Sequence, residues 1–155
     1  VDLARGLVVQ RAERVLHKYM FGTPLVTMLF AVILTVLVQS SSITTSLVIP
    51  LVGAGILTLE RIFPYTLGAN IGTTVTAMLA ALATGNVAAI TIAFSHLFFN
   101  LSGIVLVYPV RFIRAMPMHL ARGLAELTSR SRGLAVVYLV MVFYIIPGLV
   151  IFLGR

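Results

Sequence analysis

Residues 39–46 read Gln39-Ser40-Ser41-Ser42-Ile43-Thr44-Thr45-Ser46, and they lie near the middle of a longer stretch, residues 21–59, that contains no charged residue. Seven of these eight residues are polar, whereas the sequence on either side is almost entirely apolar. An unsatisfied polar group in the core of a bilayer is energetically costly, so such a cluster persists only where protein, water or a ligand satisfies it. We interpret the cluster as a binding site for a small polar solute.

The composition of the whole chain is typical of an integral membrane protein. Of its 155 residues, 60% are hydrophobic and 10% are charged, and the mean hydropathy is +1.11. Most of the basic residues flank apolar segments: Arg5, Arg11, Arg14 and Lys18 in one stretch, and Arg111, Arg114, Arg122, Arg130 and Arg132 in another. This placement indicates the positive-inside rule and contact with anionic lipid headgroups, so the net charge of +7 does not predict a nucleic-acid partner.

Hydropathy and the positions of Gly, Pro and charged residues predict an all-α membrane protein of six segments. These are an amphipathic interfacial helix over 1–20, a helical hairpin over 21–59, a transmembrane helix over 60–84, a second over 86–109, a basic amphipathic cytoplasmic connection over 110–133 and a last transmembrane helix over 134–154. Because the chain contains no cysteine, a disulfide framework and a thiolate metal site are excluded.

The segment 21–59 is too long for a single crossing. One helix of its 39 residues would extend about 58 Å, nearly twice the hydrocarbon thickness of about 30 Å. We therefore predict a hairpin whose partly unwound tip carries the Gln-Ser-Ser-Ser motif. A re-entrant hairpin and two full crossings both place the two basic flanks on the cytoplasmic side, so charge bias leaves this alternative open.

A second polar element, Gly68-Ala69-Asn70-Ile71-Gly72-Thr73-Thr74, lies inside the segment 60–84. Asn70 has one glycine on each side, and this pattern predicts a helix that breaks and restarts at membrane depth. Glycines spaced four residues apart are equally typical of a helix-packing face, so this alternative stays open. Tyr65, which precedes this element, is expected in the aromatic belt at the membrane interface.

The two polar elements contain oxygen ligands without net charge. Hydroxyls and side-chain carbonyls suit Na+, and unpaired N–H groups at helix starts suit an anion. Discontinuous helices that combine both kinds of site are a feature of ion-coupled secondary transporters. No serine has the Gly-x-Ser-x-Gly context of a hydrolase nucleophile, so we do not expect an enzyme, and we expect no cofactor beyond Na+ as the coupling ion.

The two elements, in this order and spacing, resemble those of the type II sodium/phosphate cotransporter family, particularly its bacterial members. The resemblance covers roughly residues 22–108 and implies alternating-access symport of Na+ and inorganic phosphate in a bacterial inner membrane. Family members have two inverted repeats, and this chain, with one copy of each motif, resembles the C-terminal one. The missing first repeat is expected in the same polypeptide, and assembly into a homo-oligomer is left open.

The resemblance also implies roles for individual residues. The phosphate-binding residues that it implies are Gln39, Ser40, Ser41, Ser42, Asn70 and Thr73. The sodium-binding residues that it implies are Gln39, Ser42, Thr44, Thr45, Asn70 and Thr74. Two other functions remain open: a Na+-coupled transporter of another small anion such as a dicarboxylate, and a non-transporting membrane assembly protein whose Ser and Gly residues only pack helices.

Overall fold

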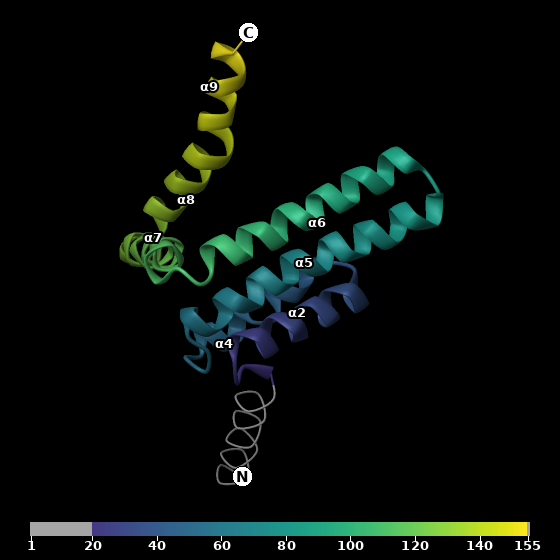
Figure 1. The fold of residues 1–155 in the computed structure, drawn as a ribbon. Coiled ribbons are helices and arrows are strands. Elements are labelled where there is room, and N and C mark those ends of the chain that lie inside the picture. The colour runs from purple at the N-terminus through teal and green to yellow at the C-terminus, as the bar shows by residue number, and fades with distance from the viewer. Residues whose placement is uncertain (1–19, 155) are drawn as a thin grey trace. The chain divides into compact units, whose positions relative to one another are not determined.

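The computed structural model describes residues 20–154, which are helical apart from short connections and contain no strand (Figure 1). The predicted all-α class is therefore confirmed. The interfacial helix predicted over 1–20 lies outside the described residues except for its last position. The chain divides into two units at residues 110 and 111, and each unit is described by itself.

The first unit begins with helix α2 (Pro24–Val38), whose ends are both defined by local signals. At its start the Thr23 side-chain oxygen accepts a hydrogen bond from the N–H of Val26, and a proline occupies the first helical position. At its end Gln39 adopts φ 58° and ψ 23°, a left-handed conformation that is uncommon for a residue with a Cβ. The helix therefore stops at Gln39, after about 22 Å.

Two short helices, α3 (Ser41–Ser46) and α4 (Ile49–Gly53), follow this stop. Ser40 caps α3, because its Oγ accepts a hydrogen bond from the N–H of Ile43 at 3.3 Å. The predicted unwinding is thus confined to residues 39–40, and the rest of the polar cluster is helical. The chain then returns toward the start of α2, since Phe21, Val48 and Leu57 belong to one buried cluster.

Helix α5 (Leu59–Thr84) is continuous over 26 residues, so the break predicted within 68–74 is wrong. Both glycines of this element face α2 instead. A Cβ on Gly68 would overlap the backbone carbonyl of Met28, and one on Gly72 would lie 2.5 Å from the Cβ of Thr35. The glycines remove the side chains that would hold the two helices apart, which is the packing alternative left open by the sequence.

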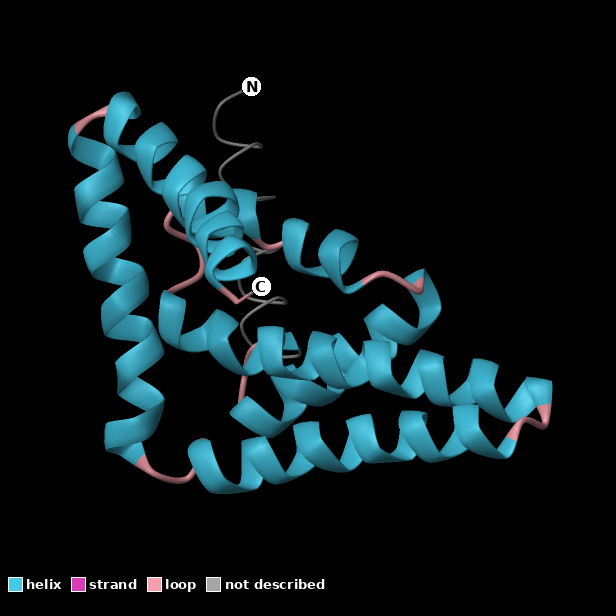
Figure 2. Ribbon diagram, turned by 90° about the horizontal axis from the view of Figure 1, so that it is seen from above, coloured by secondary structure: helices cyan, strands magenta, loops and turns pink. Residues whose placement is uncertain are grey.

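Helix α6 (Val87–Val107) runs back along α5, and Figures 1 and 2 show the two helices side by side. The reversal needs only Gly85, which has φ 64°, and Asn86. The side-chain oxygen of Asn86 accepts hydrogen bonds from the first N–H groups of α6 at 2.9 and 3.2 Å. Both helices are long and apolar enough to cross a membrane.

Tyr65 lies in the interior of the first unit, so its predicted place in an interfacial aromatic belt is wrong. Only 1% of the residue is exposed, and its ring lies 5.8 Å from that of Phe21 and 6.3 Å from that of Phe30, measured between centroids. Its hydroxyl donates a hydrogen bond to the backbone carbonyl of Thr44 at 2.9 Å. The hydroxyl is thus satisfied without water, and it connects α5 to α3.

The second unit consists of α7 (Arg111–Arg130) and a longer apolar rod. The rod is formed by α8 (Arg132–Val140), a π-helical turn η2 (Met141–Ile145) and α9 (Ile146–Leu153). Over its 22 residues it is long and apolar enough to cross a membrane. A proline near the start of α9 lacks the N–H that a regular helix would use at that position, which accounts for the wider turn before it.

Candidate functional site

Four of the predicted site residues meet at an open cavity of about 320 Å3 between α3 and α5. We call it the serine cavity. The residues that line it are Ser41, Ser42 and Thr45 from α3 and Thr66, Leu67, Ala69 and Asn70 from α5. They come from two distant parts of the sequence, which meet because the chain reverses after α2. None of these lining residues carries a charge.

The hydroxyls of the serine cavity differ in the use of their protons. The Oγ1 of Thr45 donates to the backbone carbonyl of Ser41 at 2.8 Å, so only its lone pairs remain for a ligand. The hydroxyls of Ser41 and Ser42 have no hydrogen-bond partner among the described residues and are free to donate. The cavity therefore offers hydrogen-bond donors to an anion and oxygen lone pairs to a cation.

Two other predicted site residues, Gln39 and Thr73, do not reach the serine cavity. They line a separate cavity of about 510 Å3 between α2 and α5, together with Val36, Thr76, Ala77, Leu79 and Ala80. Asn70 and Thr73 lie on one face of α5, three residues apart, so the two cavities are neighbours along this helix. The structure thus divides the predicted site between two adjacent hollows.

The remaining predicted site residues, Ser40, Thr44 and Thr74, line neither cavity. Ser40 caps α3, and Thr44 and Thr74 are 0% and 1% exposed. The Thr44 hydroxyl donates to the carbonyl of Ser40 at 2.9 Å, and the Thr74 hydroxyl to that of Ile71 at 2.7 Å. In this structure all three stabilise the local backbone, and their roles as ligands stay predictions.

Three polar residues near the site were not assigned to it from the sequence. Thr66 lines the serine cavity one turn before Asn70. Asn100, on α6, accepts a hydrogen bond from the side chain of Asn70. Thr35, on α2, is fully buried beside Gly72, and its hydroxyl has no partner within the described part of the chain. All three lie outside the two polar elements, each with apolar residues close to it in the sequence, so no motif marks them as part of the site.

Apolar side chains are exposed on the long helices of both units. Ile92 on α6 is 70% exposed and Phe152 on α9 is 77% exposed, and many of their neighbours are similar. Extended apolar surface of this kind is uncommon on soluble proteins and normal against lipid. Residues 20–154 contain three helices that are long and apolar enough to cross a membrane, and with these surfaces they define a multi-pass membrane protein with an uncharged polar cavity.

The sequence is similar to a known family of membrane transporters. Residues 3–122 match the model of the Na+/Pi-cotransporter family. Sodium-dependent phosphate transport protein 2B of Homo sapiens is 50% identical over 117 residues, which make up 74% of this chain and 17% of that protein. Sodium-dependent phosphate transport protein 2A of Ovis aries is 40% identical over 157 aligned residues, covering 96% of this chain and 24% of that protein.

The chain therefore belongs to the Na+/Pi-cotransporter family, and the resemblance found in its two motifs is confirmed. It spans only 17% to 24% of the length of the relatives just described. No solved structure is significantly similar to it.

Proposed function

We propose that the protein carries out Na+-coupled symport of inorganic phosphate across a membrane, and that the serine cavity is part of its solute site. The observation that supports this proposal is the convergence of Ser41, Ser42, Thr45 and Asn70 on one uncharged cavity that offers both donors and lone pairs. The relatives named for sodium-dependent phosphate transport support the same conclusion independently.

In this mechanism the two kinds of polar group bind different ions. The hydroxyls of Ser41 and Ser42 donate to phosphate oxygens, while Na+ is bound through the lone pairs of Thr45 and its neighbours. The positive charge of Na+ then offsets the negative charge of phosphate, so the cavity needs no arginine. Binding of one ion must raise the affinity for the other by the same factor, and a tenfold effect corresponds to about 1.4 kcal/mol.

We further propose that the hairpin over 21–59 is re-entrant. Helix α2 extends for about 22 Å, short of the hydrocarbon thickness of about 30 Å, and α3 and α4 are shorter still. The reversal after Gln39 would then lie within the membrane and hold the serine cavity there. Helices of this kind, which end inside the bilayer, are tolerated where they line a polar cavity.

The complete transporter, in this proposal, contains a second inverted repeat in the same polypeptide that closes the open side of the serine cavity. Rocking of one repeat against the other would expose the site to each side of the membrane in turn. A location in a bacterial inner membrane stays a prediction, because the relatives compared above are mammalian.

The test is uptake of radiolabelled phosphate into proteoliposomes of the complete protein, with and without an inward Na+ gradient. We expect uptake that depends on Na+ and is lost in the double variant Ser41→Ala, Asn70→Ala. A matched control is Ser95→Ala, because Ser95 is exposed on α6 and donates only to the carbonyl of Thr91 in its own helix.

Each alternative predicts a different result in this experiment. If the wild type takes up no phosphate under a Na+ gradient but takes up a dicarboxylate, the solute is another small anion. If the double variant unfolds more easily than the wild type but transports normally, the polar residues only pack helices. Either outcome would overturn the proposed role of the serine cavity in phosphate symport.

A further inference from the structure

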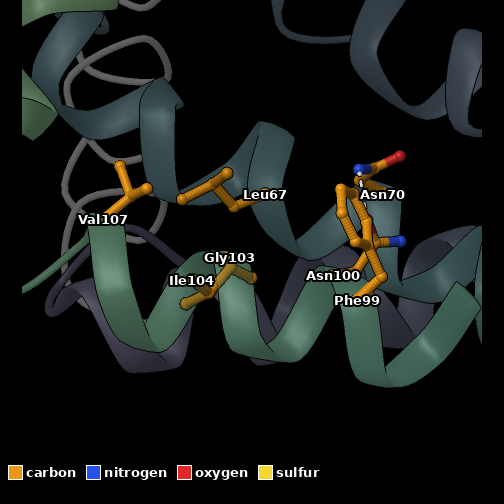
Figure 3. Close-up of a pocket in the computed structure, with 7 residues that line it drawn as sticks. All are labelled: Leu67, Asn70, Phe99, Asn100, Gly103, Ile104 and Val107. Atoms are coloured by element: carbon orange, nitrogen blue, oxygen red, sulfur yellow. Dashed lines mark hydrogen bonds between the residues drawn. The ribbon is translucent and has the colours of Figure 1, made fainter. Parts of the chain in front are cut away.

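A second polar contact connects the serine cavity to α6. A pocket of about 180 Å3 between α5 and α6 is lined by Leu67 and Asn70 of α5 and by Phe99, Asn100, Gly103 and Ile104 of α6 (Figure 3). We call it the asparagine pocket. Leu67 and Asn70 also line the serine cavity, so the Asn70 side chain is shared by the two hollows.

The contact between the two asparagines has a defined direction. The Nδ2 of Asn70 donates a hydrogen bond to the Oδ1 of Asn100 over 3.5 Å, and Figure 3 shows the Oδ1 of Asn70 on the side away from Asn100. A carboxamide has a donor end and an acceptor end. Because Asn100 holds the donor end of Asn70, the acceptor end is left for a ligand in the serine cavity.

One buried atom of the half-buried Asn100 indicates that this residue does more than fill space. Its Nδ2 is buried and has no hydrogen-bond partner among the described residues. A buried N–H without a partner destabilises a fold, and a leucine of similar size would fill the same place without that cost. The advantage of asparagine over leucine at position 100 is therefore the acceptor Oδ1, which contacts Asn70.

We propose that Asn100 is a positioning residue for the Na+ site. It holds the Asn70 amide so that the Oδ1 of Asn70 joins the Oγ1 of Thr45 as a neutral oxygen ligand for Na+ in the serine cavity. This inference rests on the proposed symport, and it specifies which groups of the cavity bind the cation. Ser41 and Ser42, whose hydroxyls are free to donate, are left to bind phosphate.

The test compares two variants of Asn100 in the complete protein, again by phosphate uptake into proteoliposomes. Asn100→Leu removes the acceptor and keeps the size, so the Na+ concentration for half-maximal uptake should rise about fivefold, the value of one net hydrogen bond. The KM for phosphate at saturating Na+ should change by less than about twofold, because Asn100 does not touch the donor groups.

Asn100→Asp keeps an oxygen acceptor at the same position and adds a negative charge near the cation. The half-maximal Na+ concentration should therefore return to the wild-type value or fall below it. If Asn70 instead turned its NH2 group to the cavity, an aspartate could not hold that orientation, and the loss of this donor would raise the KM for phosphate rather than the half-maximal Na+ concentration. Asn100→Asp replaces only the NH2 group by an oxygen, so its Na+ dependence can be measured even if Asn100→Leu does not fold.

Ser102→Ala is the matched control, because Ser102 is exposed on α6 and its hydroxyl donates to the carbonyl of Phe99 in the same helix. Wild-type uptake that does not depend on Na+ would overturn the proposed function itself. Na+-dependent wild-type uptake combined with unchanged Na+ dependence in Asn100→Leu would overturn only the positioning role. A lower maximal rate without a shift in Na+ dependence would also contradict it, since that is what a merely structural residue would cause.

Discussion

The two polar elements of the chain, residues 39–46 and residues 68–74, have opposite backbone structures although both suggest a broken helix. The first contains a real interruption, with a left-handed residue and a side-chain cap. The second is regular helix throughout, and its glycines face a neighbouring helix. Glycine in a membrane helix therefore does not by itself mark a break, whereas a capping serine after a residue with positive φ does.

Gly68→Ala should have the largest effect, because it tests the packing of the second element directly. The new Cβ would overlap the backbone of Met28, which cannot move aside as a side chain can. We expect a loss of about 2–3 kcal/mol of stability, measured as a lower Tm of the purified protein in detergent. Gly53→Ala is the control, since a Cβ there has nothing within 4 Å. Equal Tm values for Gly68→Ala and the wild type would revive the broken-helix interpretation.

Tyr65→Phe should have an intermediate effect, and it tests the connection between the two elements. The substitution keeps the ring contacts but removes the hydrogen bond to the carbonyl of Thr44, leaving that buried carbonyl without its donor. We expect a loss of about 1–2 kcal/mol in the free energy of unfolding. Because the bond holds α3 against α5, Na+-dependent uptake should fall as well. A variant with normal stability and normal uptake would show that the serine cavity does not depend on this bond.

Gln39→Gly should have the smallest effect on stability, and it tests whether Gln39 in the first element binds solute or only ends α2. Glycine adopts the left-handed conformation without crowding of its Cβ, so the Tm should stay the same or rise by the equivalent of about 1 kcal/mol. The substitution also removes the amide from the cavity that Gln39 shares with Thr73. Loss of phosphate uptake in this stable variant would support a ligand role for the Gln39 side chain. Unchanged uptake would restrict the residue to ending α2.

The sequence predicts much of this fold because its strongest signals are local. Charge-free segments of known length predict the membrane class and the need for a hairpin, since the thickness of the bilayer limits how far one helix can run. The polar cluster at 39–46 predicts where that hairpin turns, and Ser40 lies in the position that a capping residue requires. The resemblance to the family is carried by the same two motifs, each of which is one continuous run of residues, and the family model confirms it over residues 3–122.

The arrangement of the site is decided by tertiary structure. Asn70, Thr73 and Thr74 are near neighbours in sequence, yet one lines the serine cavity, one lines the neighbouring cavity and one is buried. Which of these occurs depends on how α5 is rotated against α2 and α3. No local pattern encodes that rotation.

The same limit explains the wrong prediction for Tyr65 and the missed contact between Asn70 and Asn100. A tyrosine near the end of an apolar segment suits the membrane interface equally well on sequence grounds, and only the return of α3 brings a carbonyl within reach of its hydroxyl. The contact between Asn70 and Asn100 likewise requires α6 to pack against α5 in one register. Hydropathy and motifs determine which residues are available to this protein, and helix packing decides which of them meet, because contacts between helices depend on rotation and register that single residues do not specify.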